Sequence, residues 1–360
     1  MKSIKLLLKL IFLRLSRQLY QKILLPVNYT VSVTYRCNSR CKTCNIYKIK
    51  SEELTVDEYD KIFRTIGKAA YWITISGGEP FLRRDLEEII NVMYKRSRPS
   101  IINIPTNGLL CKEIPQRVRA IAENCPNSNI VINVSIDDIE ERDSEIRGVP
   151  DAYKKALQTF EGIKKIDLCN VNVGIHTVIS KFNVGRFREI SGSLMDLHPD
   201  SYITEIAENR VELDTMNEDI TPNVMDYSQA IDFLLHKIRT TPFKGFNKIT
   251  QTFRIEYYKM VKKILKDKHR ILPCYAGILS AQIVPNGDVW PCCIKAVVIG
   301  NIKEHNYNFK KLWKTSKLLK DERKLIRQEK CYCPMANASY TNMLMSNKIL
   351  FKAVLRLLKK

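Results

Sequence analysis

The segment CNSRCKTC constrains this chain most, because it brings Cys37, Cys41 and Cys44 within eight residues of one another. The preceding TVSVTYR is rich in β-branched and aromatic residues and predicts a strand, so the cysteines lie on the loop that leaves it. Three thiolates at this spacing can bind one soft metal centre. In a cubane cluster they would leave one iron open to a small molecule. The alternative is a structural zinc site, which needs a fourth ligand.

A second segment, YWITISGGEP at residues 71–80, predicts a strand that runs into Gly77, Gly78, Glu79 and Pro80. Adjacent glycines let the backbone approach a ligand closely, and the Glu79 carboxylate can accept a cationic amine. By itself, GGEP is a turn in most proteins. Its position about 35 residues after the cysteines makes it informative.

Together these segments resemble the radical S-adenosylmethionine (radical SAM) enzymes, and the resemblance covers about residues 29–210. Further matching segments are TNG at 106–108, VSIDD at 134–138, IRG at 146–148 and GIHTVISKFN at 174–183. The resemblance implies that Cys37, Cys41 and Cys44 hold a [4Fe-4S] cluster whose open iron chelates SAM, and that the GGEP segment holds the SAM amine. One departure is Thr43, where many members carry an aromatic residue that packs on SAM.

The same resemblance implies further SAM-binding residues at the ends of other predicted strands. Ser135 and Asp137 would lie near the SAM ribose and carboxylate, and Asn107 and Arg147 are additional candidates. Each assignment has a plainer alternative, because Asp137 and Asn107 are common turn residues and Arg147 can pair with neighbouring carboxylates.

From residue 29 onward the pattern alternates between strands and helices. The predicted strands are 29–36, 71–76, 101–106, 130–136, 171–178 and 202–207. Such alternation predicts βαβ units and a parallel sheet, and therefore an α/β fold. Six units match the partial (β/α)6 barrel that the family resemblance implies. In such barrels the chemistry lies at the carboxyl ends of the strands, where each of these motifs falls.

Beyond the sixth predicted strand, TEIAENRVELD places Glu205, Glu208, Arg210 and Glu212 near the barrel mouth, and the first three of these are candidate catalytic residues. Charged groups at a barrel mouth can bind a polar substrate or act as acid or base, and a solvated loop is the alternative. Residues 226–270 predict basic helices. They contain no recognisable nucleic-acid-binding module, so a helical linker is favoured over an RNA-binding face.

Cysteines cluster again after residue 273, at Cys274, Cys292, Cys293, Cys331 and Cys333. Between the first two, AQIVPNGDVW predicts a β-hairpin with an Asn-Gly turn. The arrangement resembles the auxiliary-cluster module of radical SAM enzymes, in its twitch or SPASM form. The resemblance implies a second [4Fe-4S] cluster on Cys274, Cys292, Cys331 and Cys333. The resemblance assigns Cys292 rather than its neighbour Cys293 as the ligand, because of the position of these two cysteines after the hairpin. A zinc ribbon is the alternative.

The net charge of +21 favours an anionic partner. Residues 1–25 and 341–360 carry six and five basic residues, respectively, with no acid and many Leu and Ile residues. They predict basic amphipathic helices on an anionic membrane surface, with packing beneath the barrel as the alternative for the first. The longest apolar run near the start, from Leu10 to Leu13, is too short to span a bilayer.

Eleven cysteines that are clustered rather than spread do not predict a disulfide framework. We therefore expect a cytoplasmic protein, peripheral at the inner face of the membrane. The expected division of the chain is a basic helix (1–25), a partial barrel (26–210), a helical linker or substrate region (211–272), an auxiliary-cluster domain (273–335) and a basic tail (336–360).

The resemblance implies reductive cleavage of SAM to a 5′-deoxyadenosyl radical, which abstracts hydrogen from a small-molecule, sugar or lipid substrate. The auxiliary cluster would assist a two-electron oxidation, and flavodoxin or ferredoxin would be the reductant. One alternative is a maturase of a ribosomally made peptide, less favoured because only 36 residues precede Cys37. Another is a non-catalytic iron-sulfur or zinc protein that binds RNA, which would give no reason for GGEP.

Overall fold

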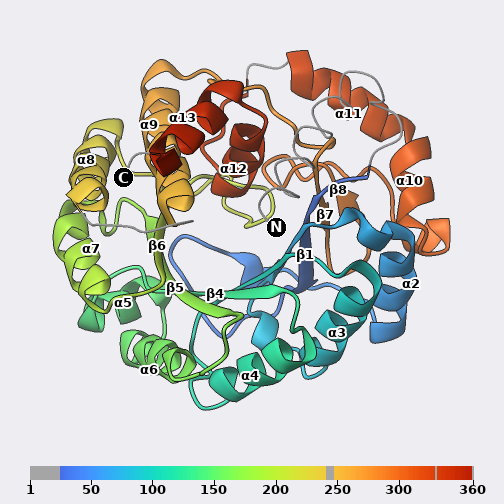
Figure 1. Ribbon diagram of the computed structural model, residues 1–360, viewed down its shortest axis with the longest axis horizontal. Coiled ribbons are helices and arrows are strands. Elements are labelled where there is room, and N and C mark those ends of the chain that lie inside the picture. Colours follow the sequence, from blue (N-terminus) through green and yellow to red (C-terminus); the bar gives the residue numbers. More distant parts are fainter. Residues whose placement is uncertain (1–24, 241–246, 329–330, 359–360) are drawn as a thin grey trace.

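A computed structural model describes residues 25–240, 247–328 and 331–358 of the chain. Its first half is a series of parallel strands joined by helices that lie outside them (Figure 1). The strands are β1 (Asn28–Thr34), β2 (Trp72–Gly77), β3 (Ile101–Thr106), β4 (Asn129–Ser135), β5 (Val171–Ile179) and β6 (Ser201–Ile206). The helices are α2 (Val56–Ile66), α3 (Leu86–Ser97), α4 (Ile114–Asn124), α5 (Glu140–Arg147), α6 (Ala152–Lys164) and α7 (Phe187–Asp196).

These six strands confirm the predicted α/β architecture, with bounds within two residues of the expected ones. The sheet order is β6-β5-β4-β3-β2-β1-β7-β8, and every pairing from β1 to β6 is parallel. Because the two end strands of this order are not paired with each other, the sheet is an open, partial barrel rather than a closed one.

The second half of the chain begins with two helices and then returns to the same sheet. Its elements are α8 (Val224–Thr240), α9 (Asn247–Asp267), β7 (Ser280–Ile283), β8 (Val289–Trp290), α10 (Phe309–Thr315), α11 (Lys317–Gln328), α12 (Ala336–Leu344) and α13 (Asn347–Leu358). The predicted hairpin is present as β7 and β8, with Gly287 at φ +94° in its turn. The sequence predicts it within a separate domain, whereas β7 pairs in parallel with β1 and extends the barrel sheet.

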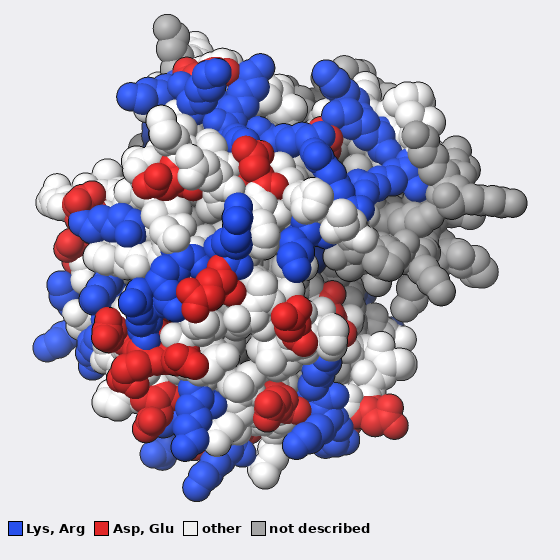
Figure 2. Space-filling view, turned by 90° about the vertical axis from the view of Figure 1, so that its left-hand side faces the viewer, with Lys and Arg blue, Asp and Glu red and all other residues white. Residues whose placement is uncertain are grey.

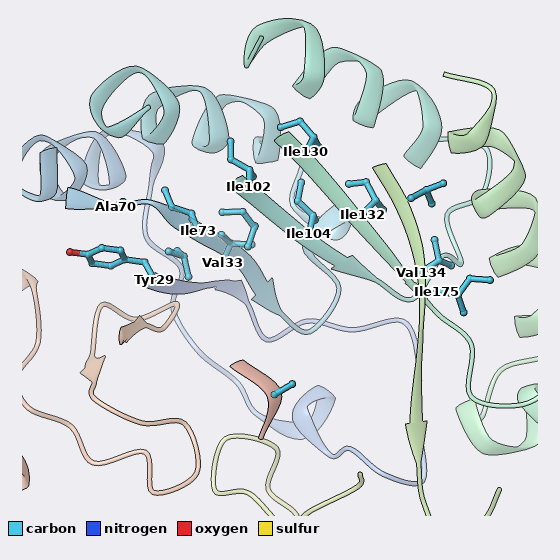
Figure 3. Packing of buried hydrophobic residues seen from close by; sticks show 14 of the residues in the cluster. Tyr29, Val33, Ala70, Ile73, Ile102, Ile104, Ile130, Ile132, Val134 and Ile175 are labelled. Atoms are coloured by element: carbon cyan, nitrogen blue, oxygen red, sulfur yellow. The ribbon is translucent and has the colours of Figure 1, made fainter. Parts of the chain in front are cut away.

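The core lies between the sheet and the surrounding helices (Figure 3). Along β3, Ile102 and Ile104 are buried and alternate with half-buried positions, as a strand with one face beneath helices requires. The opposite face carries polar side chains: the Asn133 side-chain amide donates to Asn103 Oδ1 at 2.7 Å, and Asn103 Nδ2 lies 3.5 Å from the Thr74 hydroxyl. The barrel interior is therefore polar, which suits a polar ligand.

Of the two predicted terminal helical segments, the structure describes only the one at the carboxy-terminal end. Residues 1–24, nearly all of the expected amphipathic helix at the start, lie outside the described residues. The basic tail forms α12 and α13, which both pack on α9 (Figure 1). Among the described helices, none combines the length and apolar character needed to cross a bilayer.

The contact between Phe309 and Tyr29 joins the two halves, because the rings lie 5.4 Å apart and both are fully buried. We expect Phe309→Ala to lower the free energy of unfolding by about 3–5 kcal/mol through loss of buried apolar surface and creation of a cavity. Leu318→Ala is the control, because Leu318 is 56 % exposed, and it should change stability by less than about 0.5 kcal/mol. Urea unfolding measures both, and equal effects would contradict this account of the core.

Candidate functional site

The cysteine loop follows β1 and is held on both sides by backbone hydrogen bonds. On one side, the Gly78 amide donates to the Thr34 carbonyl at 2.8 Å, and the Glu79 amide donates to the Arg36 carbonyl at 2.9 Å. On the other side, the Arg40 and Lys42 amides donate at 2.9 and 2.8 Å to the last residues of α5, Arg147 and Ile146. The GGEP and IRG segments thus hold the loop that carries Cys37, Cys41 and Cys44 in place through backbone hydrogen bonds.

The two glycines of GGEP permit the close approach of the GGEP backbone to the cysteine loop. A Cβ atom at Gly77, where φ is +126°, would lie 2.0 Å from the Thr34 carbonyl oxygen, and one at Gly78 would lie 2.2 Å from that of Arg36. The sequence suggests that these glycines make room for a ligand. In the structure they make room for the backbone that leads to Cys37, because the ends of β1 and β2 approach each other there.

The three thiols of this loop face a largely buried environment. The Ser39 hydroxyl lies 3.2 Å from the Cys41 sulfur and donates to the Arg147 carbonyl at 3.0 Å. Burial raises the pKa of all three thiols, that of Cys44 to about 12. A thiol with a raised pKa is protonated near neutral pH, so three adjacent thiolates here require a cationic centre to balance them. This donor set fits an iron-sulfur cluster, since soft thiolates select such centres.

Glu79 does not project freely toward a ligand. Its carboxylate accepts hydrogen bonds from the Thr106 hydroxyl at 2.9 Å, the Asn107 amide at 2.6 Å and the Phe81 amide at 3.1 Å. Burial raises its pKa although these donors oppose the rise. Pro80 is buried and begins the short 3-10 turn that follows. The carboxylate therefore ties the GGEP turn to the end of β3.

Arg147 ties the ends of two further strands to the cysteine loop. Its guanidinium is 1 % exposed and donates to the carbonyl oxygens of Ser135, at the end of β4, and of Asn107, the latter at 2.6 Å. The Asn107 side chain in turn reaches toward the Cys37 sulfur at 3.8 Å. The structure therefore brings Arg147, Ser135 and Asn107 together beside the cysteines, with Arg147 fully engaged by protein atoms except at Nε, which is buried without a hydrogen-bond partner.

Asp137 lies deeper, at the exit of β4. Its carboxylate accepts from the Val178 amide at 2.8 Å, and its own amide donates to the Asp143 carboxylate at 2.8 Å. Burial raises the pKa of Asp137 to about 6, with the Arg147 charge opposing the rise. The Asp137 carboxylate thus joins β4 to β5. This structural role resembles the alternative in which Asp137 shapes a turn more than the one in which it contacts SAM.

The three candidate catalytic residues form a compact charged group. Arg210 lies 3.3 Å from the Glu205 carboxylate and 3.4 Å from that of Glu208, and each of the three side chains is less than one-fifth exposed. Burial raises the pKa of Glu208 to about 7 although Arg210 opposes this rise. A carboxyl group that titrates near 7 is suited to proton transfer at neutral pH. The solvated-loop alternative does not describe this group.

The segment that carries this group runs between the two cysteine clusters. The Asn45 amide, next to Cys44, donates to the Leu213 carbonyl at 2.9 Å, and the Val211 amide lies 3.4 Å from the carbonyl of Ile294, next to Cys293. Burial and then the Glu208 charge raise the pKa of Cys333, so the two side chains are electrostatic neighbours. Substrate bound at this group would therefore lie between the two sets of thiols.

Four of the carboxy-terminal cysteines, Cys274, Cys292, Cys331 and Cys333, are neighbours of one another, whereas Cys293 faces the barrel mouth. A cavity is lined by Cys274, Cys331 and Cys333, and the Cys292 thiol has Cys274 and Cys331 among its charged neighbours. Arg270 donates to the Cys331 sulfur at 2.8 Å. At neither cysteine set, nor elsewhere in the described residues, do three His, Cys, Asp or Glu side chains converge closely enough to hold a single metal ion.

Cys293 is 5 % exposed and faces the barrel mouth. After burial, the charges of Glu212 and Arg210 have the largest effects on its pKa, which lies well above the usual range. The structure thus favours Cys292 over Cys293 as a member of the carboxy-terminal set.

Two residues of the site, Gln282 and His176, are not evident from the sequence. Gln282 is buried and hydrogen-bonded to Glu212, which the sequence places near the barrel mouth, and it also donates to the Ser32 hydroxyl at 3.2 Å. His176 on β5 has Glu205 and Arg210 as electrostatic neighbours. Gln282 had one available signal, since it is a polar residue between the apolar Ala281 and Ile283. The pairing of β7 with β1 that brings it to the site has no local signal.

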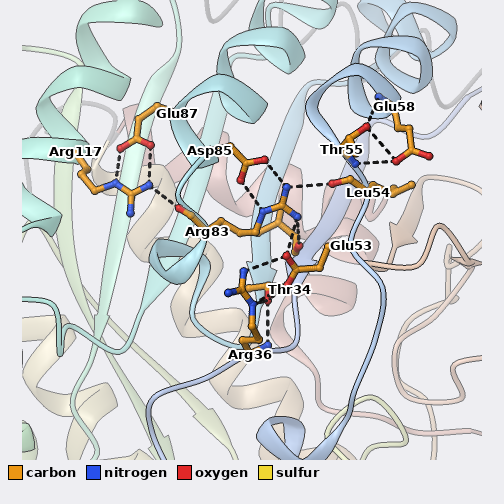
Figure 4. A network of polar contacts seen from close by, with 11 residues as sticks. Thr34, Arg36, Glu53, Leu54, Thr55, Glu58, Arg83, Asp85, Glu87 and Arg117 are labelled. Carbon is orange, nitrogen blue, oxygen red and sulfur yellow. Dashed lines mark hydrogen bonds and ion pairs between the residues drawn. The ribbon is translucent and has the colours of Figure 1, made fainter.

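A second polar network supports the start of the cysteine loop from outside (Figure 4). Arg83 is 4 % exposed and binds the Asp85 carboxylate at 2.6 Å and the Glu53 carboxylate at 3.2 Å. Glu53 also accepts from Arg36 at 3.0 Å and from the Thr34 hydroxyl. The network fixes the direction in which the chain leaves β1 toward Cys37.

The hydrogen bonds between the end of α5 and the cysteine loop require glycine at position 148. Its φ is +63°, and a Cβ atom there would lie 2.6 Å from the Arg40 carbonyl oxygen. We expect Gly148→Ala to lower the free energy of unfolding by more than about 2 kcal/mol, from backbone strain plus this clash. Urea unfolding gives the stability, and alkylation of Cys41 followed by mass spectrometry should show a faster-reacting thiol.

Gly67→Ala is the matched control for this variant. Gly67 also has a positive φ, +55°, but its ψ of −143° differs from the +31° of Gly148, and a Cβ atom there would meet nothing within 4 Å. It should cost about 1–3 kcal/mol from backbone strain alone and leave Cys41 as slow to react as in the wild type. A Cys41 thiol that reacts equally fast in the two variants would show that the contact with Arg40 does not matter.

Two protein families match this chain. The radical SAM superfamily matches residues 31–193, and the iron-sulfur cluster-binding domain called SPASM matches residues 274–335. Together these families imply a SAM-binding [4Fe-4S] cluster and an auxiliary iron-sulfur cluster.

Curated relatives include the Fe-coproporphyrin III synthase of Methanosarcina barkeri, 28 % identical over 60 % of this chain and 52 % of that protein. The GTP 3′,8-cyclase of Staphylococcus aureus is 32 % identical over 42 % of this chain and 45 % of that protein. The chain thus spans about half the length of these relatives.

Solved structures with the same fold include Streptococcus suis SuiB bound to S-adenosylmethionine, with a TM-score of 0.61 and 15 % identity over 86 % of this chain and 71 % of that one. The enzyme anSMEcpe with bound AdoMet has a TM-score of 0.62 and 15 % identity over 93 % of this chain and 96 % of that one. The chain therefore contains a radical SAM domain at residues 31–193 and a SPASM iron-sulfur domain at residues 274–335, in the order that the sequence predicts.

Proposed function

We propose that Cys37, Cys41 and Cys44 hold the SAM-binding cluster and that Glu205, Glu208 and Arg210 bind the substrate beside it. When bound, the cluster and SAM together supply a 5′-deoxyadenosyl radical, which removes a hydrogen atom from a carbon of the substrate. The observation that carries the proposal is the position of the segment with the charged group. Leu213 and Val211 of this segment bond to residues next to Cys44 and Cys293, and Glu208 is an electrostatic neighbour of Cys333.

The chain's own residues would prepare this reaction by orientation and charge. Arg210 holds Glu205 and Glu208 in place, since its guanidinium lies within 3.4 Å of both carboxylates. Glu208, with a pKa raised by burial to about 7, can take up a proton that the substrate loses when a hydroxyl carbon is oxidised. Arg147 and Glu79 keep the strand ends and the cysteine loop in register, so that SAM and the substrate meet at one point.

The substrate class follows from the charges of this group. Three carboxylates, Glu205, Glu208 and Glu212, surround a single guanidinium, and Gln282 adds an amide. Such a site offers mainly hydrogen-bond acceptors, so it suits a neutral polar or cationic group such as a sugar hydroxyl or an amine. A small polar molecule, sugar or the polar head of a lipid meets this requirement. Peptide modification remains the second candidate, since SuiB has been solved with a precursor peptide and shares this fold.

For the auxiliary cluster we propose Cys274, Cys292, Cys331 and Cys333 as ligands. Four protein ligands leave no open iron, so this cluster would carry an electron rather than bind substrate, and a dehydrogenation would follow. The electron for the first cluster would come from a flavodoxin or ferredoxin.

The ligand sets predict the iron content after anaerobic reconstitution. We expect about eight irons in the wild type and about four in the Cys37/Cys41/Cys44 triple Ala variant, because each set holds one cubane. Cys292→Ser should also fall to about four irons, whereas Cys293→Ser, its adjacent control, should keep about eight. Iron and zinc are measured by plasma emission. Zinc with half the iron in the wild type, or iron loss in Cys293→Ser alone, would refute these assignments.

Reductive cleavage of SAM tests the first cluster directly. With SAM and dithionite, the reconstituted wild type should release 5′-deoxyadenosine, and Cys37→Ala, Cys41→Ala and Cys44→Ala should each release none above background. Removing any one thiolate destroys the open-iron site, whereas Cys111→Ala, a half-buried cysteine outside both sets, should behave as the wild type. Product is quantified by liquid chromatography. Continued cleavage in any of the three variants would count against the proposal.

A further inference from the structure

The outward face of α13 carries three large apolar side chains that the described residues leave uncovered. Phe351 is 64 % exposed, and Val354 and Leu355 are each 43 % exposed. Their spacing of three and four residues puts them on one face of the helix. The opposite face, with Ile349 and Ala353, is buried where α13 packs on α9. The helix is therefore fixed on the protein by one face and presents an apolar face outward.

Basic residues border this apolar face. Lys348 is exposed and lies one turn before Phe351, and Lys352 binds the Glu256 carboxylate of α9 at 2.6 Å. Glu256 is also within 3.6 Å of Lys259, and the exposed Lys263 follows Lys259 by one turn of α9. Two lysines thus neutralise the single carboxylate, and the border remains positive.

The segment that contains α13 has the same sign, because residues 341–360 contain no Asp or Glu. On the side of the molecule that lies at the left in Figure 1, Lys and Arg side chains are widespread, with Asp and Glu side chains among them (Figure 2). A second copy of the chain that used the same face would bring these lysines against their own equivalents, which disfavours self-association there. A partner with an anionic surface and an apolar interior can bind the lysines of the border and bury the apolar face of the helix.

We propose that α13, with the adjoining lysines of α9, is a docking surface for an anionic lipid bilayer. Phe351, Val354 and Leu355 enter the boundary between headgroups and acyl chains, and Lys348, Lys259 and Lys263 lie at the level of the lipid phosphates. The rigid attachment of α13 to α9 means that the helix does not have to fold on binding, so little ordering entropy is lost. This proposal does not depend on the proposed reaction.

The test is co-sedimentation of the full chain with vesicles of phosphatidylcholine alone or mixed with phosphatidylglycerol, at low and high salt. The wild type should bind the mixed vesicles, and salt should weaken the binding. The variant Phe351→Ser/Val354→Ser/Leu355→Ser should bind at least about tenfold more weakly, and Lys259→Gln/Lys263→Gln about fivefold or more. The control Met225→Ser/Leu318→Ser changes equally exposed side chains on other elements and should bind as the wild type.

Thermal unfolding must first show that each variant is folded. If the triple variant is unstable, the single Phe351→Ser replaces it, because this side chain is the most exposed of the three. Equal binding by wild type and α13 variants, which binding through residues 1–24 alone would produce, overturns the proposal. So does a wild-type dimer in sedimentation equilibrium that the triple variant converts to monomer, since the apolar face would then serve a second copy.

Discussion

The arrangement of the site depends on how closely three backbone segments approach one another around the cysteine loop. The ends of β1 and β2 come within hydrogen-bonding distance only because Gly77 and Gly78 have no side chain. On the other side of the loop, α5 ends at Gly148, which has a left-handed conformation, and two carbonyl oxygens at the end of this helix accept hydrogen bonds from amides of the loop. A metal-ligating loop held on both sides can keep its thiols in position without regular structure of its own.

Buried charges then join the strand ends to this loop. Arg147 bonds to the carbonyl of Ser135 at the end of β4 and to that of Asn107, the first residue beyond β3, and Glu79 binds the backbone amide of Asn107. Both are almost fully buried, and an isolated charge in such a place would be costly. Here each is compensated, Arg147 by carbonyls and carboxylates and Glu79 by three donors. Residues that a family resemblance implies as SAM-binding therefore also organise the protein, so substituting them would affect structure as well as binding.

The continuity of the sheet explains how a second cysteine cluster is placed precisely relative to the first. Because β7 pairs with β1, the hairpin that precedes Cys292 and the loop that carries Cys37 are anchored to neighbouring strands. The segment with Arg210 then lies between them through hydrogen bonds of Leu213 and Val211. Electron transfer and hydrogen abstraction both depend steeply on distance, so one sheet holding both cysteine sets suits the proposed chemistry.

The parallel α/β architecture, the six barrel strands and the hairpin are predictable from the amino-acid sequence, because hydrophobic periodicity and the Asn286-Gly287 turn are local signals. The cysteine motifs and GGEP are also evident there, since their spacing is a property of the chain. Three features emerge only in the folded protein: β7 pairs with β1, Gly78 makes room for Arg36 rather than for a ligand, and Cys293 faces the barrel mouth. These outcomes depend on contacts between residues tens or hundreds of positions apart, on which strand lies next to which, and on the direction of each side chain, and none of these leaves a periodic trace in the sequence.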